Sequence, residues 1–374
     1  MKMSFCIIAT LFCLFCISPY QSVYGDPLNS NEVKKYLDDY TLNTPSKAGA
    51  VALLHTNTER QIIASGYANK EKKLPITTDS RFHIASLTKM FTAVIIYQLI
   101  EEGHLTLDTK VSHILDSKVY EKIDNFGDAT IEMLLEHSSG MPDFIGSAFD
   151  EAAINAKNHN WSAEEALNFI QDTPAHFKAG SEYAYSSTGY VLLGEVIKLI
   201  EQEDDLNKIF KRRIFDPCDI HNTYFPPSTR PRASQLARGY DMIGIHMRDV
   251  SDIMWGERLA DGGLVSTAED LEKFLTALLI EKSLISPEHL SIMMDIDKTL
   301  PDHAPGGRGL MLLNHYDHSG AYPLYYGHFG LYLGYRSAAF YAPDTGDMII
   351  ILANSADFPT HTMLEKLGIL APLK

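Results

Sequence analysis

A serine and a lysine stand three residues apart where a long apolar segment begins. Ser86 and Lys89 are followed at once by residues 90–100, which are apolar on nearly every side of a helix. We therefore expect a buried helix with Ser86 in its first turn, where unpaired N–H groups and the helix dipole favour an oxyanion. Lys89 then lies on the same face, and an amine in apolar surroundings can activate a neighbouring serine. Taken alone, the pair fits a helix cap with a snorkelling lysine equally well.

A tyrosine that can complete this chemistry lies 99 residues further along the chain (185 − 86). Tyr185-Ser186-Ser187 precedes an apolar helical pattern that runs to Glu201. A phenol in this loop can accept the proton of Ser86 if nearby cations lower its pKa. In isolation, a loop tyrosine is more typical of an ordinary surface position.

A third segment, Gly327–Leu331, lies just before an expected strand. Its glycines allow a strand edge to approach a substrate closely. His328 can donate a hydrogen bond to a substrate or tune Tyr185, and the N–H of Leu331 can complete an oxyanion hole with that of Ser86. By itself, one histidine among 15 is weak evidence for a site.

Together, the three segments resemble the three motifs of the penicillin-recognising serine hydrolases, in the same order. Their first residues are separated by 99 (185 − 86) and 143 (328 − 185) positions. The chain looks most like the branch that contains class C β-lactamases, D-Ala-D-Ala carboxypeptidases and related esterases. The matched motifs and supporting stretches are Ser86-Leu87-Thr88-Lys89, Tyr185-Ser186-Ser187, His328-Phe329-Gly330, and residues 134–143, 261–267 and 334–337. The resemblance covers about residues 45 to 355.

This resemblance implies an α+β fold, in which an antiparallel β-sheet is flanked by helices and joined to an all-helical subdomain. It also implies that Ser86 is acylated, that Lys89 and Tyr185 move its proton, and that water releases the acyl group. The residues that it places against the substrate are Ser187, His328, Gly330 and Leu331. Neither a metal ion nor an organic cofactor is implied.

Two positions depart from the family's pattern. Position 187 usually carries an asparagine, whereas Ser187 has a shorter reach and only one donor. The third motif commonly reads Lys-Thr-Gly in the β-lactamases, and Phe329 lacks the hydroxyl that helps relatives to bind a substrate carboxylate. Losing one such charge-assisted contact costs about 1.5–3 kcal/mol. If His328 must be charged to bind an anionic substrate, kcat/KM should fall as the pH rises through the histidine pKa, ordinarily about 6.5.

We expect a hydrolase of acyl or peptide bonds, in the first place a D-Ala-D-Ala carboxypeptidase-like peptidase or an esterase. A class C-like β-lactamase and a catalytically weak penicillin-binding sensor are the alternatives. An α/β-hydrolase is disfavoured because no Gly-x-Ser-x-Gly elbow occurs. The His-Tyr-Asp-His segment at 315–318 lacks the spacing of a metal site and is interpreted as a surface loop.

Both ends of the chain have strand patterns, whereas the middle is largely helical. The expected strands are 48–55, 61–67, 335–341 and 348–354, and the expected helices are 131–136, 163–171, 190–201, 268–281 and 362–367. One sheet built from both ends, about 26–115 and 291–374, should therefore lie beside a helical part at about 116–290, with the active cleft between them.

Residues 1–25 have the pattern of an export signal. Lys2 provides the positive start and residues 5–17 form the apolar run, which is short for a membrane span of about 20 residues. We therefore expect a mature protein of residues 26–374 that is periplasmic or secreted, without stable membrane insertion. Only Cys218 remains after the leader is removed, so no internal disulfide can form.

The charge of the mature chain limits its partners. Removing Lys2 leaves 31 basic residues against 48 acidic ones, a formal charge of −17 (31 − 48). Such a surface repels nucleic acid and anionic lipid. The expected partner is a small-molecule or peptide acyl substrate, and the oligomeric state stays open.

Overall fold

The structure is a computed structural model that describes residues 30–43, 46–116, 118–227, 235–256, 258–298, 305–315, 317 and 321–371. The leader expected at residues 1–25 lies outside these described residues. Among the helices in the described ranges, none is long and apolar enough to cross a membrane.

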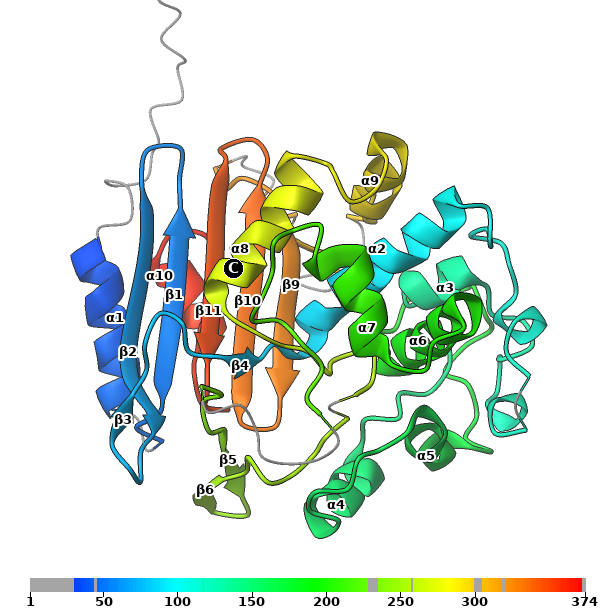
Figure 1. Cartoon of the computed structure of the whole chain (residues 1–374), viewed down its shortest axis with the longest axis horizontal. Coiled ribbons are helices and arrows are strands. Elements are labelled where there is room, and N and C mark those ends of the chain that lie inside the picture. Colours follow the sequence, from blue (N-terminus) through cyan, green and yellow to red (C-terminus); the bar gives the residue numbers. More distant parts are fainter. Residues whose placement is uncertain are drawn as a thin grey trace, which may run out of the picture.

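Among the described residues, seven strands form an antiparallel sheet in the order β3-β2-β1-β11-β10-β9-β8 (Figure 1). The strands are β1 (Gly49–His55), β2 (Arg60–Asn69), β3 (Leu74–Pro75), β8 (Met311–Leu313), β9 (Tyr325–Tyr332), β10 (Tyr335–Ala342) and β11 (Asp347–Ala353). Strand β1 pairs with β11, so that Val51 lies opposite Leu352. The two ends of the chain therefore meet in one sheet, which confirms the expected fold class.

Both faces of this sheet are buried. Along β1, Val51 faces one hydrophobic core and Ala50 faces the other, as the two-residue period of a strand requires. Helices α1 (Ser30–Asn43) and α10 (Thr360–Lys366) cover the Ala50 face, and α8 (Ala268–Leu275) crosses the opposite face (Figure 1). Burial on both faces explains why β1 and β11 are nearly continuous apolar runs.

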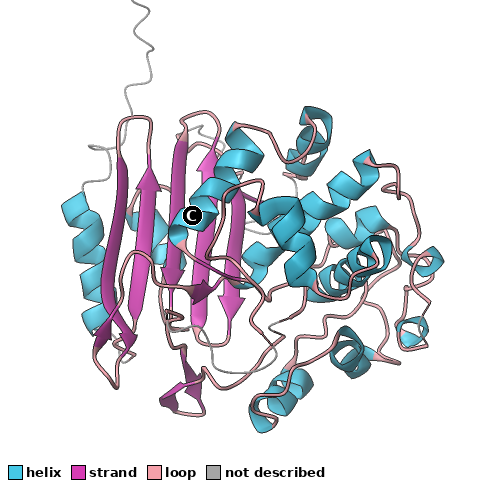
Figure 2. Cartoon of the chain, in the orientation of Figure 1, coloured by secondary structure: helices cyan, strands magenta, loops and turns pink. Residues whose placement is uncertain are grey.

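The other side of the molecule is largely helical (Figure 2). Its helices are α2 (Thr88–Glu101), α3 (Ile131–Leu135), α4 (Ser147–Asn155), α5 (Ala163–Leu167), α6 (Ser187–Glu201), α7 (Leu206–Phe210) and α9 (Pro287–Met294). In α2, 11 of the 14 residues are buried, which confirms the buried helix expected after Ser86. This helix packs against α6, so two helices that begin near the predicted site support each other.

Short strands lie between the two sides. Strand β4 (Phe82–His83) pairs with β7 (Val265–Ser266), and β5 (Tyr240–Ile243) pairs with β6 (His246–Asp249). Three of these strands and α8 belong to residues 116–290, and α8 packs against β1 and β11. The division into a sheet part and a helical part at these boundaries stays a prediction.

Two of the expected helices change their type before they end. The segment 268–281 forms α8 and then a π-helical turn, Thr276–Ile280, and the segment 163–171 forms α5 and then a 3₁₀ turn, Asn168–Ile170. Strand β9 contains the segment 327–331, for which a strand edge was expected without bounds.

Candidate active site

Ser86 lies in a 3₁₀ turn, η1 (Ala85–Leu87), which connects β4 to α2. Ala85 has a φ of +53°, a left-handed conformation that is costly for alanine. Ala85 and Leu87 are buried, whereas Ser86 is partly exposed. The N–H of Ser86 is one of the first in a helical stretch, and such groups have no carbonyl partner within the helix. A strained turn anchored in the core thus presents this serine.

Lys89 is completely buried beneath Ser86. Its Nζ donates to Ser86 Oγ at 3.1 Å, to Ser187 Oγ at 3.3 Å and to the backbone carbonyl of Asp261 at 2.8 Å. These three acceptors match the three donors of an ammonium group. The lysine therefore does not snorkel to solvent but contacts the predicted nucleophile.

Tyr185 lies on the other side of Lys89. The Nζ of Lys89 is 5.1 Å from the centre of the Tyr185 ring and 5.5 Å from that of Tyr190. The Tyr185 hydroxyl is buried and forms no hydrogen bond with any described residue. Its ring stacks on His137, with 4.4 Å between the ring centres. The phenol is therefore held in place by its ring, and its hydroxyl is available to a reacting group.

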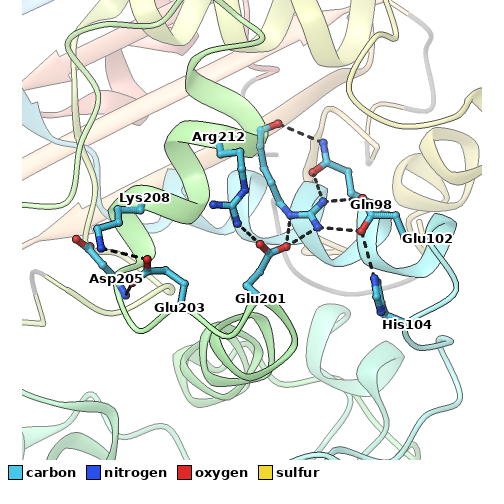
Figure 3. A network of polar contacts seen from close by, with 9 residues as sticks. Gln98, Glu102, His104, Glu201, Glu203, Asp205, Lys208 and Arg212 are labelled. Carbon is cyan, nitrogen blue, oxygen red and sulfur yellow. Dashed lines mark hydrogen bonds and ion pairs between the residues drawn. The ribbon is translucent and has the colours of Figure 1, made fainter.

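The far ends of α2 and α6 are tied together by ion pairs (Figure 3). Arg213 binds Glu102, just after α2, at 2.8 Å, and it also binds Glu201, the last residue of α6. Arg212 pairs with Glu201 as well. Because these helices carry Lys89 and Ser187 at their other ends, the network supports the geometry of the site from about 20 Å away, the length of a helix of 14 residues.

Strand β9 forms the opposite wall, and Gly330 is where it meets the serine turn. A Cβ atom at Gly330 would lie 2.0 Å from Ser337 Oγ, 2.4 Å from the Ile84 carbonyl oxygen and 3.0 Å from Ala85 Cβ. Any larger residue would force β9 and η1 apart. Phe329 points to the other face of the sheet, where its ring stacks on His361 at 4.3 Å.

The surroundings of His328 do not favour the charged form that binding of an anionic substrate would require. His328 is 1% exposed, and its Nδ1 donates to the backbone carbonyl of Phe329. Burial and the neighbouring Lys89 ammonium lower the pKa of His328 to about 3. A neutral imidazole therefore faces Tyr185, with 6.1 Å between the ring centres, and it supplies no charge for an anionic substrate.

Leu331 occupies a free strand edge. On the side away from β10, β8 pairs only with Tyr325–Gly327 among the described residues. A two-residue turn joins Tyr332 to Tyr335. In such a hairpin the residue pair next to the turn, Tyr332 with Tyr335, exchanges backbone hydrogen bonds, whereas the following pair, Leu331 with Arg336, does not. The N–H and C=O of Leu331 therefore point away from β10, as an oxyanion donor at this position requires.

A hollow of about 290 Å³ adjoins this edge. Leu331, Tyr332 and Trp255 contribute apolar surface to it, and Arg336 also lines it. A larger hollow, of about 420 Å³, lies between α5, α6 and α7 and contains none of the predicted site residues. Of these two hollows, the smaller one includes Leu331, and neither is lined by Ser86, Lys89 or Tyr185.

Two acids near Lys89, the buried Asp261 and the partly buried Asp143, were not predicted as site residues. Asp143 accepts the N–H groups of Ser187 and Ile145, both at 3.1 Å. Asp261 is 5% exposed, and its Oδ1 has no hydrogen-bond partner among the described residues. Burial raises the pKa of Asp143 and raises that of Asp261 to about 6, against the pull of Lys89 on both carboxylates.

These acids and His137 belong to the stretches 134–143 and 261–267, which supported the family resemblance without a role for each residue. His137 is buried, and the Ser186 N–H donates to its Nδ1 at 3.2 Å. Burial, Lys89 and His328 lower the pKa of His137 well below its usual value, so it supports Tyr185 as a neutral ring.

Three further features, a possible metal site, the segment 315–318 and the Cys218 thiol, add no group to the site within the described residues. Among the described residues, no group of three or more His, Cys, Asp or Glu side chains could hold a metal ion. The segment 315–318 lies partly outside the described residues. Burial raises the pKa of the half-buried Cys218 thiol to about 11, which leaves it un-ionised and unreactive.

Comparison with known proteins agrees with this geometry. The sequence description of the Beta-lactamase family matches residues 41–371, which is most of the chain. The chain belongs to the beta-lactamase family. It is thus a serine hydrolase of the fold shared by β-lactamases, penicillin-binding proteins and related amidases.

Individual relatives of this family member are distant. Penicillin-binding protein 4* of Bacillus subtilis (strain 168) is 27% identical over 299 residues, which cover 74% of this chain and 63% of that protein. A D-amino acid amidase from Ochrobactrum anthropi SV3 is 26% identical with a TM-score of 0.74, covering 88% of this chain and 93% of that one. The octameric penicillin-binding protein homologue of Pyrococcus abyssi is 26% identical with a TM-score of 0.76, over 91% and 78% of the two chains. The chain therefore spans less than two thirds of the Bacillus protein.

Proposed function

We propose that the protein hydrolyses amide or ester bonds through an acyl-enzyme on Ser86. The observation that carries this proposal is the contact between Lys89 Nζ and Ser86 Oγ, with the lysine wholly buried. Ser86 Oγ attacks the carbonyl carbon, and Tyr185 takes the serine proton while it gives its own to the leaving group. The Lys89 ammonium holds Ser86 Oγ in place during this step. The N–H groups of Ser86 and Leu331 hold the oxyanion, and water then releases the acyl group as an acid.

The substrates that fit best are amides of D-amino acids and small esters. The likeness to a D-amino acid amidase supports the first class. Neither His328, which is neutral, nor Phe329, which points away, supplies a charge for a free carboxylate. We place the side chain of the acyl group in the hollow beside Leu331, which is lined by Trp255 and Tyr332 and by the charged residues Asp150, Asp241 and Arg336.

A D-Ala-D-Ala carboxypeptidase-like reaction is the second candidate, and the likeness to Penicillin-binding protein 4* favours it. Its substrates end in a free carboxylate, for which the neutral His328 is a poor partner. A class C-like β-lactamase and a weak penicillin-binding sensor remain as alternatives. The contacts of Ser86, Lys89 and Tyr185 argue against a sensor without turnover.

The test compares covalent labelling with product release. Purified protein is incubated with p-nitrophenyl acetate, D-phenylalanine amide, a peptide ending in D-Ala-D-Ala, and a cephalosporin. We expect turnover of the ester and the amide, slow turnover of the peptide, and an acyl adduct that maps to Ser86. The Ser86→Ala variant serves as the control and should lose both adduct and turnover. Equal turnover by this variant would refute the mechanism.

We also propose that the protein is exported after removal of residues 1–25, to the periplasm or the medium. The leader pattern of the sequence is the support for this step. Intact-mass measurement of protein recovered outside the cytoplasm tests it. A mass that corresponds to a start at Asp26 is expected, and full-length protein confined to the cytoplasm would contradict export.

A further inference from the structure

Asp261 is a buried acid beside the site that the proposed reaction leaves without a role. It is 5% exposed, and its Oδ1 has no hydrogen-bond partner among the described residues. Its carboxylate contacts the hydroxyl of Ser187. Burying a carboxylate with one unpaired oxygen is unfavourable for folding, so its presence in this place calls for a functional reason.

Lys89 is a buried cation whose hydrogen-bond acceptors are all uncharged. Its Nζ is fully buried and donates to two hydroxyls and one backbone carbonyl, all of which are neutral. In the part of the chain that the structure describes, no carboxylate contacts this Nζ directly. A buried ammonium needs an opposite charge nearby to remain ionised.

Ser187 connects the two groups. Its Oγ lies 3.3 Å from Lys89 Nζ, which donates to it, and the same hydroxyl contacts the Asp261 carboxylate. A serine hydroxyl has one proton to donate and can accept a bond at the same time. A hydroxyl between these two groups can therefore accept from the ammonium and donate to the carboxylate, and the backbone carbonyl of Asp261 accepts a second bond from Lys89 at 2.8 Å.

We propose that Asp261 is a positioning residue for acylation, whose ionised carboxylate acts through Ser187 to hold the Lys89 ammonium against Ser86 Oγ. This inference rests on the proposed function, because it names what keeps the catalytic lysine in place. Asp261 itself neither touches the substrate nor takes the serine proton.

The other charged and titratable groups around Lys89 do not fill this role. The two oxygens of Asp143 are engaged by the N–H groups of Ser187 and Ile145. His137 and His328 are neutral because their pKa values are lowered by burial. The remaining neighbours are the phenols Tyr185 and Tyr190, and the Tyr190 hydroxyl donates to the backbone carbonyl of Leu135 at 2.8 Å.

A consequence for the pH dependence of acylation follows. Burial raises the pKa of Asp261 to about 6, and a protonated Asp261 no longer attracts the ammonium. Acylation should therefore be slower below about pH 6 and level off above it.

The first experiment measures the rate of p-nitrophenol release in the first turnover, from pH 4.5 to pH 8. In Asp261→Asn we expect the acidic limb of the profile to disappear and the plateau to fall about 10- to 100-fold, with KM within about twofold. The matched control, Asp143→Asn, removes a partly buried acid that is bound only to backbone N–H groups, and it should keep the acidic limb. An Asp261→Asn profile that overlaps the wild-type profile would overturn the proposal.

Ser187→Ala adds a second check, since it removes the bridging hydroxyl. If Asp261 acts through Ser187, the double variant should be no slower than Ser187→Ala alone. Additive losses would mean that the two side chains act separately, which contradicts the proposed connection.

A last measurement does not need turnover. The ¹³C signal of the Asp261 carboxyl carbon is titrated by NMR in the wild-type protein and in Lys89→Met. We expect a midpoint near pH 6 in the wild type and a higher midpoint without the ammonium. Equal midpoints would show that Asp261 and Lys89 are not coupled and would overturn the inference. If the coupling is present but Ser86 is never acylated, the proposed function fails and the positioning contact stands.

Discussion

The two walls of the cleft hold their polar groups in different ways. On the helical wall, Lys89 is enclosed by Ser86, Ser187 and the Asp261 carbonyl, all within 3.3 Å of its Nζ. On the strand wall, His328 bonds to the backbone of the next residue, and Leu331 is 59% exposed. The helical wall is a closed hydrogen-bond network, whereas the strand wall is a strand edge with backbone groups that a substrate can reach.

This difference separates proton transfer from substrate recognition. A group that moves a proton must stay within hydrogen-bond reach of its partner, so it needs several simultaneous contacts. A strand edge binds substrates through its backbone N–H and C=O groups, and these groups do not change when a side chain is substituted. The helical wall therefore tolerates little change, while the strand wall can exchange side chains such as Phe329 and alter specificity.

The largest effect is expected from the closed network. Lys89→Met keeps the aliphatic stem but removes the amine, so acylation should slow by about 10²- to 10⁴-fold. Single-turnover release of p-nitrophenol measures this rate. Circular dichroism of the folded variant is the control, and a loss of less than tenfold would show that the helical wall is not the catalytic one.

The strand wall should be sensitive at Gly330, where it contacts the serine turn. Gly330→Ala places a Cβ 2.4 Å from the Ile84 carbonyl oxygen, so the turn that carries Ser86 must shift. A displacement of this size should reduce kcat/KM by about 10²-fold. Gly146→Ala is the matched control, because a Cβ there has nothing within 4 Å and should leave kcat/KM unchanged. Similar activity in both variants would contradict the close approach of β9 to η1.

Asp261 should change how stability depends on pH. Because its folded-state pKa, about 6, lies above its ordinary value of 3.8, its stabilising contribution is greatest at low pH and is lost as the pH rises through 6. Between pH 4 and pH 7.5, the free energy of unfolding of Asp261→Asn should gain about 2 kcal/mol relative to the wild type. Urea unfolding at both pH values measures this difference. A constant difference would show that Asp261 titrates at an ordinary pH.

The smallest effect is expected at His328. Since its pKa is lowered to about 3, the ring does not change its charge between pH 5.5 and pH 7.5. His328→Gln should therefore reduce kcat/KM by less than about tenfold and leave the shape of the pH profile in this range unchanged. A fall of wild-type kcat/KM on raising the pH through 6.5 that disappears in the variant would restore the charged-histidine hypothesis.

Much of the site was predictable because its chemistry depends on local spacing. The helical period brings Ser86 and Lys89 to one face, and the apolar residues 90–100 require that face to be buried. Apolar runs at both ends of the chain also predicted the strands that became β1, β2, β10 and β11. The bounds of β9 were not predicted, and the contact of its Gly330 with η1 joins distant segments, which no local pattern reveals.

Residue order and local periodicity thus determined which side chains are available and which helix buries them, since both follow from contacts within a few positions along the chain. Only the tertiary structure decided their charge states. Whether His328 is protonated, and whether Asp261 pairs with Lys89, depends on burial and on neighbours from distant segments, since desolvation and Coulomb energies are set by three-dimensional surroundings.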